Sequence, residues 1–320
     1  MAITLEEARK NITDDLQAGV IDEFRKSSFI MDNIPFDDVV SPAGGGSGLT
    51  YAYTRLITQP TAGFRSVNAE YTPQEVAKKR YTVDLKVFGG SFKMDRIIAK
   101  MGGIASEVEL QLQQKIKATR AVFSDTFFNG DSAVDAEAFD GLDKAITGSS
   151  TEFNAGASDS IIDLSSSAQV DANYKVFLDM LDEFLTGMDG EVSFIAGNTK
   201  MIAKIRACAR RAGMYQMNMN DIGRKVESYG PVPFIDAGAK PGSNDPIISI
   251  GADGSTSLFA GRFGMDGIHG ISRAGQPIIE TFLPDFKQPG PVKEGEVEMV
   301  AAIALRSSKS AGIFRKIKVK

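Results

Sequence analysis

Two segments decide the fold of this chain: "LTYAYTRLI" (residues 49–57) and "YTVDLKVFGGSFKMD" (residues 81–95). Both are rich in β-branched and aromatic residues, and in the second apolar and polar residues alternate, which is the period of a half-buried strand. More than 20 residues separate the two segments, although a tight hairpin needs only about 2–5. We therefore expect a long two-stranded arm. Because an isolated two-stranded ribbon is marginally stable in water, the arm needs a partner surface on its own subunit or on a neighbour.

The glycine run "SPAGGGSGLTYAY" (residues 41–53) precedes this arm. Glycine-rich segments can bind phosphates, because their bare backbone N–H groups can approach an anion closely. Phosphate loops, however, lead from a strand through the glycines into a helix, and here no helix is expected for over 40 residues. We therefore predict a flexible joint that lets the flanking segments swing independently. Its hinge residues are Gly44, Gly45, Gly46 and Gly48.

Downstream of the arm, the sequence predicts one long helix and then a mixed domain. Apolar residues recur at steps of four and seven over residues 103–128, which places them on one helical face. Beyond residue 170 the patterns indicate two amphipathic helices, residues 171–187 and 198–213. Short strands are expected at "VSFIAG" (192–197), "VPFIDAG" (232–238), "PIISIG" (246–251) and "TSLFAGRFG" (256–264). The tail, residues 297–320, indicates two strands joined by a serine-lysine turn, which either pair with each other or extend another sheet.

The composition is that of a soluble globular protein, with 42% hydrophobic and 24% charged residues. A net charge of −5 lacks the basic excess that is usual in proteins that grip nucleic acid through phosphates. The single cysteine, Cys208, excludes an internal disulfide framework and fits a reducing compartment. The chain holds no apolar run long enough to predict a membrane span, so no membrane partner is expected.

Little in the sequence points to catalysis. The common nucleophile, phosphate-loop and metal-binding motifs are absent, and the single histidine, His269, cannot form a metal site alone. We therefore predict no catalytic residue, no cofactor and no metal. The acidic loop 128–144 is expected to be solvated. One distant alternative stays open, a cytosolic carboxylate-dependent enzyme that uses the carboxylates of residues 131–143 with His269.

The order of these elements resembles that of the major capsid proteins of tailed bacteriophages, whose fold is named after phage Hong Kong 97. An apolar N-terminal arm, a glycine joint, a long β-arm, a long helix, a mixed domain and returning strands follow one another. The strings that carry the resemblance are "GVIDEFRKSS" (19–28), "FGGSFKMDR" (88–96), "LQQKIKATRAVFSDTFFNGD" (112–131), "AFDGLDKAITG" (138–148) and "LPDFKQPGPVKEGEVEMVAAIALRSSKSAGIFRKIKVK" (283–320). The resemblance covers essentially the whole chain and rests on the order of these strings.

The resemblance implies an α+β fold with five regions. These are an N-terminal arm (1–45), an extended β-hairpin loop (46–96), a peripheral domain with a spine helix over 103–128 (97–167), an axial domain (168–275) and a return to the peripheral domain (276–320). The segment 213–230 then sits near the five- or six-fold centre of a capsomer. Met1 starts almost directly at the arm, so we expect a separate scaffolding protein or none.

The implied function is structural. The chain is expected to self-assemble through hexamers and pentamers into an icosahedral shell that encloses the packaged phage genome without sequence-specific DNA binding. Assembly would take place in the host bacterial cytoplasm, the mature location would be the virion capsid, and further partners would be a portal and, optionally, decoration proteins. The nearest alternative is an encapsulin-like nanocompartment, which shares the fold and encloses cargo enzymes.

Contacts between subunits are expected at two places, the arm and the basic region that begins near residue 210. The expected contact residues are Phe64, Arg65, Glu70, Tyr71, Lys78, Lys79, Arg80, Arg210, Arg211 and Arg224. Some relatives link a lysine of the extended loop to an asparagine of a neighbour, and residues 78–79 lie in the corresponding region. No matching asparagine or activating carboxylate can be placed, so we expect non-covalent locking.

Overall fold

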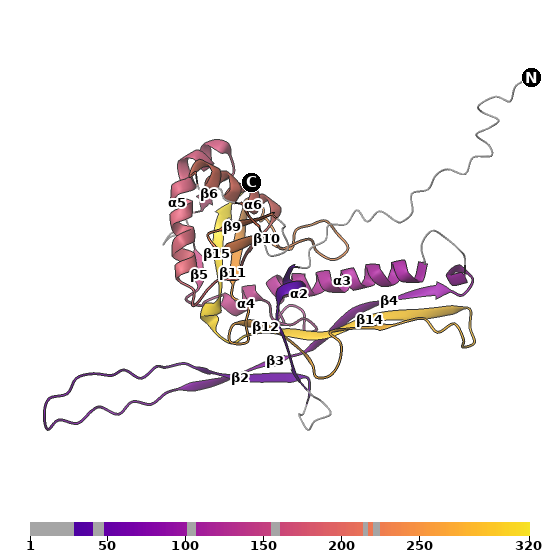
Figure 1. Ribbon diagram of the computed structural model, residues 1–320, viewed down its shortest axis with the longest axis horizontal. Helices are drawn as coiled ribbons and strands as arrows, with labels where there is room; N and C mark the ends of the chain where they lie inside the picture. The colour runs from indigo at the N-terminus through magenta and orange to yellow at the C-terminus, as the bar shows by residue number, and fades with distance from the viewer. Residues whose placement is uncertain (1–28, 41–47, 101–106, 155–160, 214–216, 220–224) are drawn as a thin grey trace, which may run out of the picture.

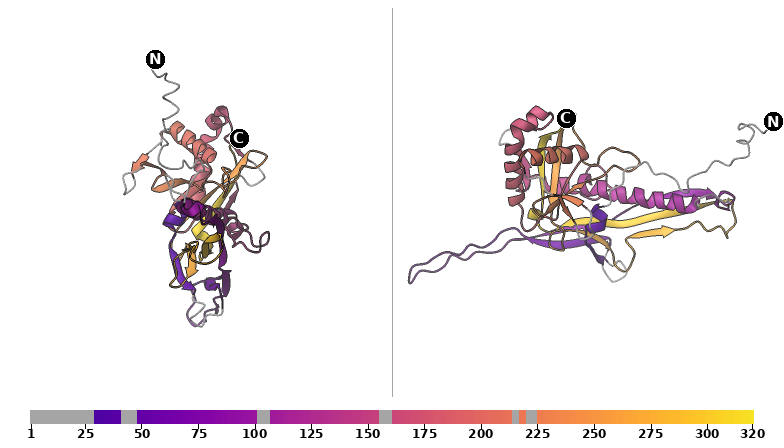
Figure 2. Two further views of the ribbon diagram at one scale, coloured as in Figure 1. Left: turned by 90° about the vertical axis from the view of Figure 1, so that its right-hand side faces the viewer. Right: turned by 45° about the horizontal axis from the view of Figure 1, so that its top comes forward.

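The chain folds into a two-part body from which a long arm projects (Figures 1 and 2). The structure is a computed structural model, and it describes residues 29–40, 48–100, 107–154, 161–213, 217–219 and 225–320. In Figure 1 the helix α3 (Glu107–Asn129) lies along the strands β4 (Lys86–Asp95) and β14 (Val292–Leu305) and points to one end of the molecule. The arm points to the other end.

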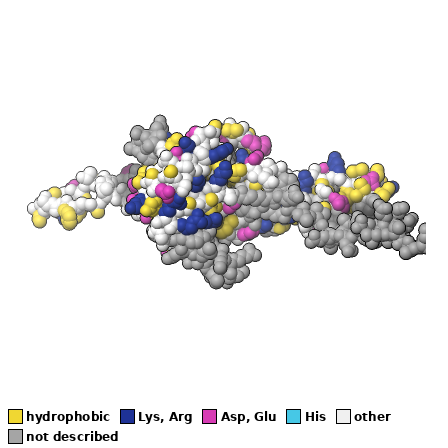
Figure 3. Space-filling view, turned by 90° about the horizontal axis from the view of Figure 1, so that it is seen from above, with side chains coloured by type: hydrophobic (Ala, Val, Ile, Leu, Met, Phe, Trp, Pro, Cys, Tyr) yellow, Lys and Arg dark blue, Asp and Glu magenta, His cyan; other side chains and the backbone are white. Residues whose placement is uncertain are grey.

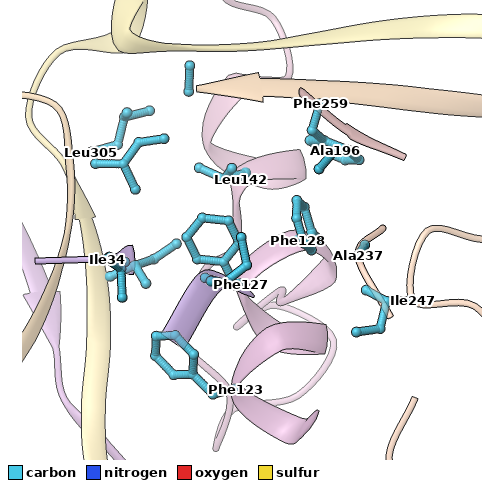
Figure 4. Packing of buried hydrophobic residues seen from close by; sticks show 14 of the residues in the cluster. Ile34, Phe123, Phe127, Phe128, Leu142, Ala196, Ala237, Ile247, Phe259 and Leu305 are labelled. Atoms are coloured by element: carbon cyan, nitrogen blue, oxygen red, sulfur yellow. The ribbon is translucent and has the colours of Figure 1, made fainter. Parts of the chain in front are cut away.

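The first sheet forms the elongated part of the body. Its strand order is β1 (Phe36–Val40), β12 (Ile268–Arg273), β14 and β13 (Ile279–Phe282), and β4 pairs antiparallel with β14 from Asp95↔Val292 to Lys86↔Ala301. The α3 helix packs on β4 and β14 and confirms the predicted long helix over the described residues. Its phenylalanines Phe123, Phe127 and Phe128 are fully buried (Figure 4). They form the centre of the largest apolar core, together with residues from both sheets.

The second sheet belongs to the upper part of the body in Figure 1. Its strand order is β5 (Glu152–Asn154), β15 (Ala311–Lys318), β11 (Ser255–Gly261), β7 (Phe194–Gly197), β10 (Val232–Asp236), β9 (Lys225–Tyr229) and β8 (Met217–Met219), and β6 (Ile162–Asp163) also pairs with β15. The predicted helices are found as α5 (Ser167–Thr186) and α6 (Thr199–Arg211). Each begins at a side-chain cap, Ser166 and Asn198 respectively, which satisfies a backbone N–H of the first turn. Short helices complete the body: α2 (Phe29–Asn33), η2 (Ile98–Lys100), α4 (Leu142–Ile146) and η3 (Ser308–Ser310).

The arm is the antiparallel pair of β2 (Thr50–Leu56) and β3 (Lys78–Asp84), as predicted. The expected single strand over residues 81–95 is wrong, however, because the chain changes sheets at Leu85. The Leu85 side chain is buried and its N–H donates to the carbonyl of Leu49. The arm therefore ends at Leu85, and the following strand β4 belongs to the body.

Two other strand predictions need correction. The segment 246–251 is not a strand, since only Pro246 makes an isolated bridge, while Ile247 and Ile248 are buried in the main core. The apolar residues of this segment therefore indicate burial in the core and not pairing in a β-sheet. The two tail strands β14 and β15 do not pair with each other, because each extends a different sheet. The second of the two tail alternatives is thus the correct one.

Candidate assembly surfaces

The outer part of the arm contacts little of its own chain. Every residue from 57 to 77 is exposed, including Phe64 at 109% and Val67 at 88% relative exposure. A backbone hydrogen bond from Ile57 to Ala77 continues the pairing beyond β2 and β3. Figure 3 shows hydrophobic side chains at the far end of the arm. A solvated loop has no physical need for such residues, so this end of the arm fits an apolar partner surface.

The arm tip nevertheless has a defined local conformation. The amide of Thr61 donates to the Gln74 side chain across the arm, at 2.7 Å. Asn68 has a φ of +66°, which turns the chain at the tip. The Arg65 guanidinium lies 5.3 Å from the centre of the Tyr71 ring, a cation–π contact that presents both side chains together. The tip is therefore a shaped element although the body does not cover it.

The predicted contact residues fall on separate parts of the molecule. The tip carries Phe64, Arg65, Glu70 and Tyr71, the strand β3 carries Lys78, Lys79 and Arg80, and the end of α6 carries Arg210 and Arg211. The three groups do not form one surface in a single chain. Arg224 and the hinge residues Gly44, Gly45 and Gly46 lie outside the described residues, whereas Gly48 has a φ of +131° that favours glycine.

The α6 helix carries a basic surface. It contains Lys200, Lys204, Arg206, Arg210 and Arg211 and no acidic residue. In Figure 3 Lys and Arg side chains gather on this upper face of the body. Some of this charge is already used within the chain, since Arg211 pairs with Asp171 and the Lys204 ammonium donates to a backbone carbonyl.

The sequence analysis missed a cluster at the arm base. Tyr53 donates to the carbonyl of Leu305 at 2.9 Å, and Arg55 donates to the carbonyls of Leu305 and Arg306. The Arg55 guanidinium also lies 4.3 Å from the centre of the Tyr81 ring. Burial raises the pKa of Tyr53, so its hydroxyl stays protonated and able to donate. These contacts fasten the arm base to the end of β14.

A second surface that the sequence analysis missed lies at the end of the molecule opposite the arm (Figure 1). Ile97, Ile98 and Val292 are exposed where the β4–β14 pair ends, and Phe282 and Leu283 are exposed at the end of β13. The pair of isoleucines in "DRIIAK" (95–100) was the available signal, because apolar residues next to a turn are expected to be covered.

The acidic loop is held by ion pairs. The Lys144 ammonium lies 2.6 Å from Asp131 and 2.9 Å from Asp140, and Arg315 binds Asp143 and Glu152. The hydrogen bond from Lys144 lowers the pKa of Asp131. No cluster of metal-ligating side chains occurs among the described residues, and no hydrogen bond there joins the loop to His269.

Comparison with known proteins locates the fold. No protein-family model matches the chain, and no curated protein matches its sequence. Among solved structures, the SrpI encapsulin of Synechococcus elongatus is similar at 13% identity, with a TM-score of 0.67 and coverage of 100% of this chain and 98% of that one. The capsid of Myoviridae phage XM1 has 13% identity and a TM-score of 0.60, with 99% of each chain covered. The capsid of a native GTA particle has 12% identity and a TM-score of 0.59, also with 99% of each chain covered.

These similarities extend over whole chains, so the fold is that of the Hong Kong 97-like shell proteins, and the expected α+β fold class is confirmed. In the part of the chain that the structure describes, no helix has the length and apolar character required to cross a membrane.

Proposed function

We propose that this chain is a major capsid protein that self-assembles through hexamers and pentamers into an icosahedral shell around a packaged phage genome. The observation that carries the proposal is the whole-chain fold combined with an arm whose apolar tip has no partner surface among the described residues of its own chain. A subunit of a closed shell can bury such an arm on its neighbour.

The geometry of the arm suits contact between subunits. About ten residues lie on each side of the tip beyond the paired strands, and extended chain spans about 3.3 Å per residue, so the tip can reach roughly 33 Å past the ends of β2 and β3. Burying an apolar side chain such as Phe64 stabilises a contact by about 2 kcal/mol. Several contacts of this size in each subunit are individually weak, but a closed shell makes them jointly strong.

The regions named from the sequence acquire roles under this proposal. Residues 1–45 form the N-terminal arm, and the extended loop expected over 46–96 is limited to the arm that ends at Leu85. The strand β4 then joins the peripheral domain of residues 97–167 and 276–320, and residues 168–275 form the axial domain. The segment 213–230 lies near the capsomer centre, and the glycine joint lets the two arms move independently. A portal completes the assembly in the host cytoplasm.

The shell would hold DNA without gripping it. The net charge of −5 supports this proposal, because tight phosphate binding requires a basic excess. The basic surface of α6 is a local exception. Its direction in a shell, toward the interior or the exterior, decides whether it contacts the genome.

The decisive experiment is to express the full chain, purify it and examine it by negative-stain electron microscopy and sedimentation. We expect closed particles or capsomers that are much larger than the 34.4 kDa chain. A protein that stays monomeric over the whole accessible concentration range, with and without its neighbouring phage genes, would overturn the proposal.

An encapsulin-like compartment is the second candidate. It is favoured by the TM-score of 0.67 with the SrpI encapsulin, which exceeds the values of 0.60 and 0.59 for the two phage-type capsids above. The two functions differ in what the particles contain. Nuclease-resistant DNA of defined length in particles from the native source supports the capsid, whereas a co-purifying enzyme without DNA supports the compartment.

A further inference from the structure

A small apolar cluster seats the arm base on the body. Its buried members come from the arm, from the junction after it and from the first sheet: Val40, Tyr51, Leu85, Ile271, Val300 and Ala304. This cluster is much smaller than the two cores of the body. We call this cluster the seat of the arm. Because it is small, a change in one buried group is expected to weaken it.

His269 lies on the same side of this sheet. It is two residues from Ile271 in β12, so both side chains point to the same face. The imidazole is fully buried, and its centre lies 5.8 Å from the Tyr51 ring in an edge-on arrangement. Neither ring nitrogen has a hydrogen-bond partner among the described residues. A neutral ring tolerates this site, whereas a protonated ring would place a charge in a buried environment near the like charge of Arg306.

The ionisable groups around the ring come from three elements. Asp37 in β1 accepts a hydrogen bond from the Tyr51 hydroxyl at 3.3 Å, and Tyr51 itself belongs to β2. Arg306, just after β14, donates to the same hydroxyl and lies over the Tyr51 ring. Burial and the positive charge of Arg306 lower the pKa of His269, against smaller opposing effects of Asp37 and of the backbone at Gly267 and Gly264.

We propose that His269 makes the seat of the arm pH-dependent, so that protonation of the buried ring loosens β2 from β12 and β14. Once the seat opens, the ring reaches water and regains its ordinary affinity for a proton. The proton therefore binds the loosened state more tightly than the seated one. The inference concerns contacts within one chain, and it holds whether or not the chain builds a shell.

The direction of the effect follows from linkage. Because the seated state lowers the pKa, the seat is at full strength above the ordinary histidine value near 6.5 and weakens as pH falls below it. The equilibrium constant for opening rises by up to about tenfold for each pH unit, until the seated ring itself protonates. Carboxyl groups ordinarily titrate near pH 4. Measurements between about pH 7.5 and 5.5 thus separate the histidine from them.

Two measurements on the full chain test the proposal. Because the sequence has one histidine, its Hε1 ring proton gives a single nuclear magnetic resonance signal that needs no assignment to a residue. Hydrogen exchange with mass spectrometry, corrected for the intrinsic pH dependence, follows the segments 49–56 and 78–85. The segment 311–318 in β15 is the internal reference, and the variants His269→Gln and His269→Leu remove the titration while keeping a polar or an apolar side chain.

We expect the histidine signal to titrate below 6.5 and exchange at the arm base to rise several-fold as pH falls from about 7.5 to 5.5, with the β15 segment unchanged. Both variants should lose this pH response, whatever their exchange rate at neutral pH. An ordinary titration near 6.5 would overturn the proposal, as would an arm base with the same pH profile in the wild type and in either folded variant.

Discussion

Replacement of Phe64 by alanine tests the role of the arm most directly. The Phe64 side chain is fully exposed in the single chain, at 109% relative exposure. Its removal takes no contact away from the body, so the free energy of unfolding should stay within about 0.5 kcal/mol of the wild-type value. Assembly, in contrast, should suffer if a neighbouring subunit buries this ring.

The size of the assembly defect can be worked out. Full burial of a phenylalanine stabilises a contact by about 2 kcal/mol, and truncation to alanine loses most of that. Since 1.4 kcal/mol corresponds to about a factor of ten, each arm contact should weaken by roughly 30-fold. Each subunit contributes one arm, so the protein concentration needed for assembly should rise by at least the same factor.

The assay is light scattering against protein concentration, with thermal unfolding of the unassembled subunit measured in parallel. Val134→Ala is the matched control, because Val134 is 87% exposed on the acidic loop and is not part of the arm tip. The control should assemble at the wild-type concentration. If Phe64→Ala also assembled at that concentration, the tip would not be buried on a neighbour and the reasoning would be wrong.

Three further predictions concern the body and the mature particle. Gly89→Ala should lower the melting temperature by several degrees, because an added Cβ would lie 2.0 Å from the carbonyl oxygen of Val297, whereas Gly63→Ala on the open arm should have little effect. Glu152→Gln should destabilise the subunit at pH 7 more than at pH 3, measured by urea unfolding: a backbone N–H and the paired guanidinium lower the Glu152 pKa, so its contribution is present above the ordinary carboxyl range and is lost on acidification. Mature particles should run as one 34.4 kDa band in denaturing electrophoresis, and a ladder would show that the lysines at 78–79 or others are cross-linked.

The elements that the sequence predicts best are those with a clear local pattern. The helices α3, α5 and α6 repeat apolar residues at helical spacing, and the buried strand β7 is a short apolar run bounded by glycine. In each case the pattern records burial against a core, which is the main source of stability of these elements.

Strand partners were predicted less well, because pairing depends on residues far away in the sequence. Periodicity cannot show that the chain changes sheets at Leu85, since the alternation continues from β3 into β4. Likewise, β14 and β15 are neighbours in sequence, but the turn between them leads from one sheet to the other. An alternation of apolar and polar residues with a period of two shows which face of a strand is buried, but it does not identify the partner strand.

The candidate assembly surfaces also divide into a part that local sequence predicts and a part that depends on distant residues. The length of the connection between the two β-rich segments indicated the projecting arm, because a tight hairpin needs far fewer residues. The arm base was missed, although Tyr51, Tyr53 and Arg55 lie on one face of β2, since three such residues also fit an ordinary sheet surface. Their partner Arg306 is about 250 residues away, and only the folded chain brings it to the arm.

The arm thus has two ends with opposite requirements. The base is fixed by specific hydrogen bonds and a small buried cluster, so it sets the direction in which the arm leaves the body. The tip has a defined shape but contacts only its own hairpin, so it can follow a neighbour without loss of core packing. In the proposed shell, the tip would take up the differences between neighbours, and the base would keep the direction of the arm. The small cluster around Tyr51 and His269 is the part of the base that can open at least cost, because its opening leaves the two main cores of the body intact.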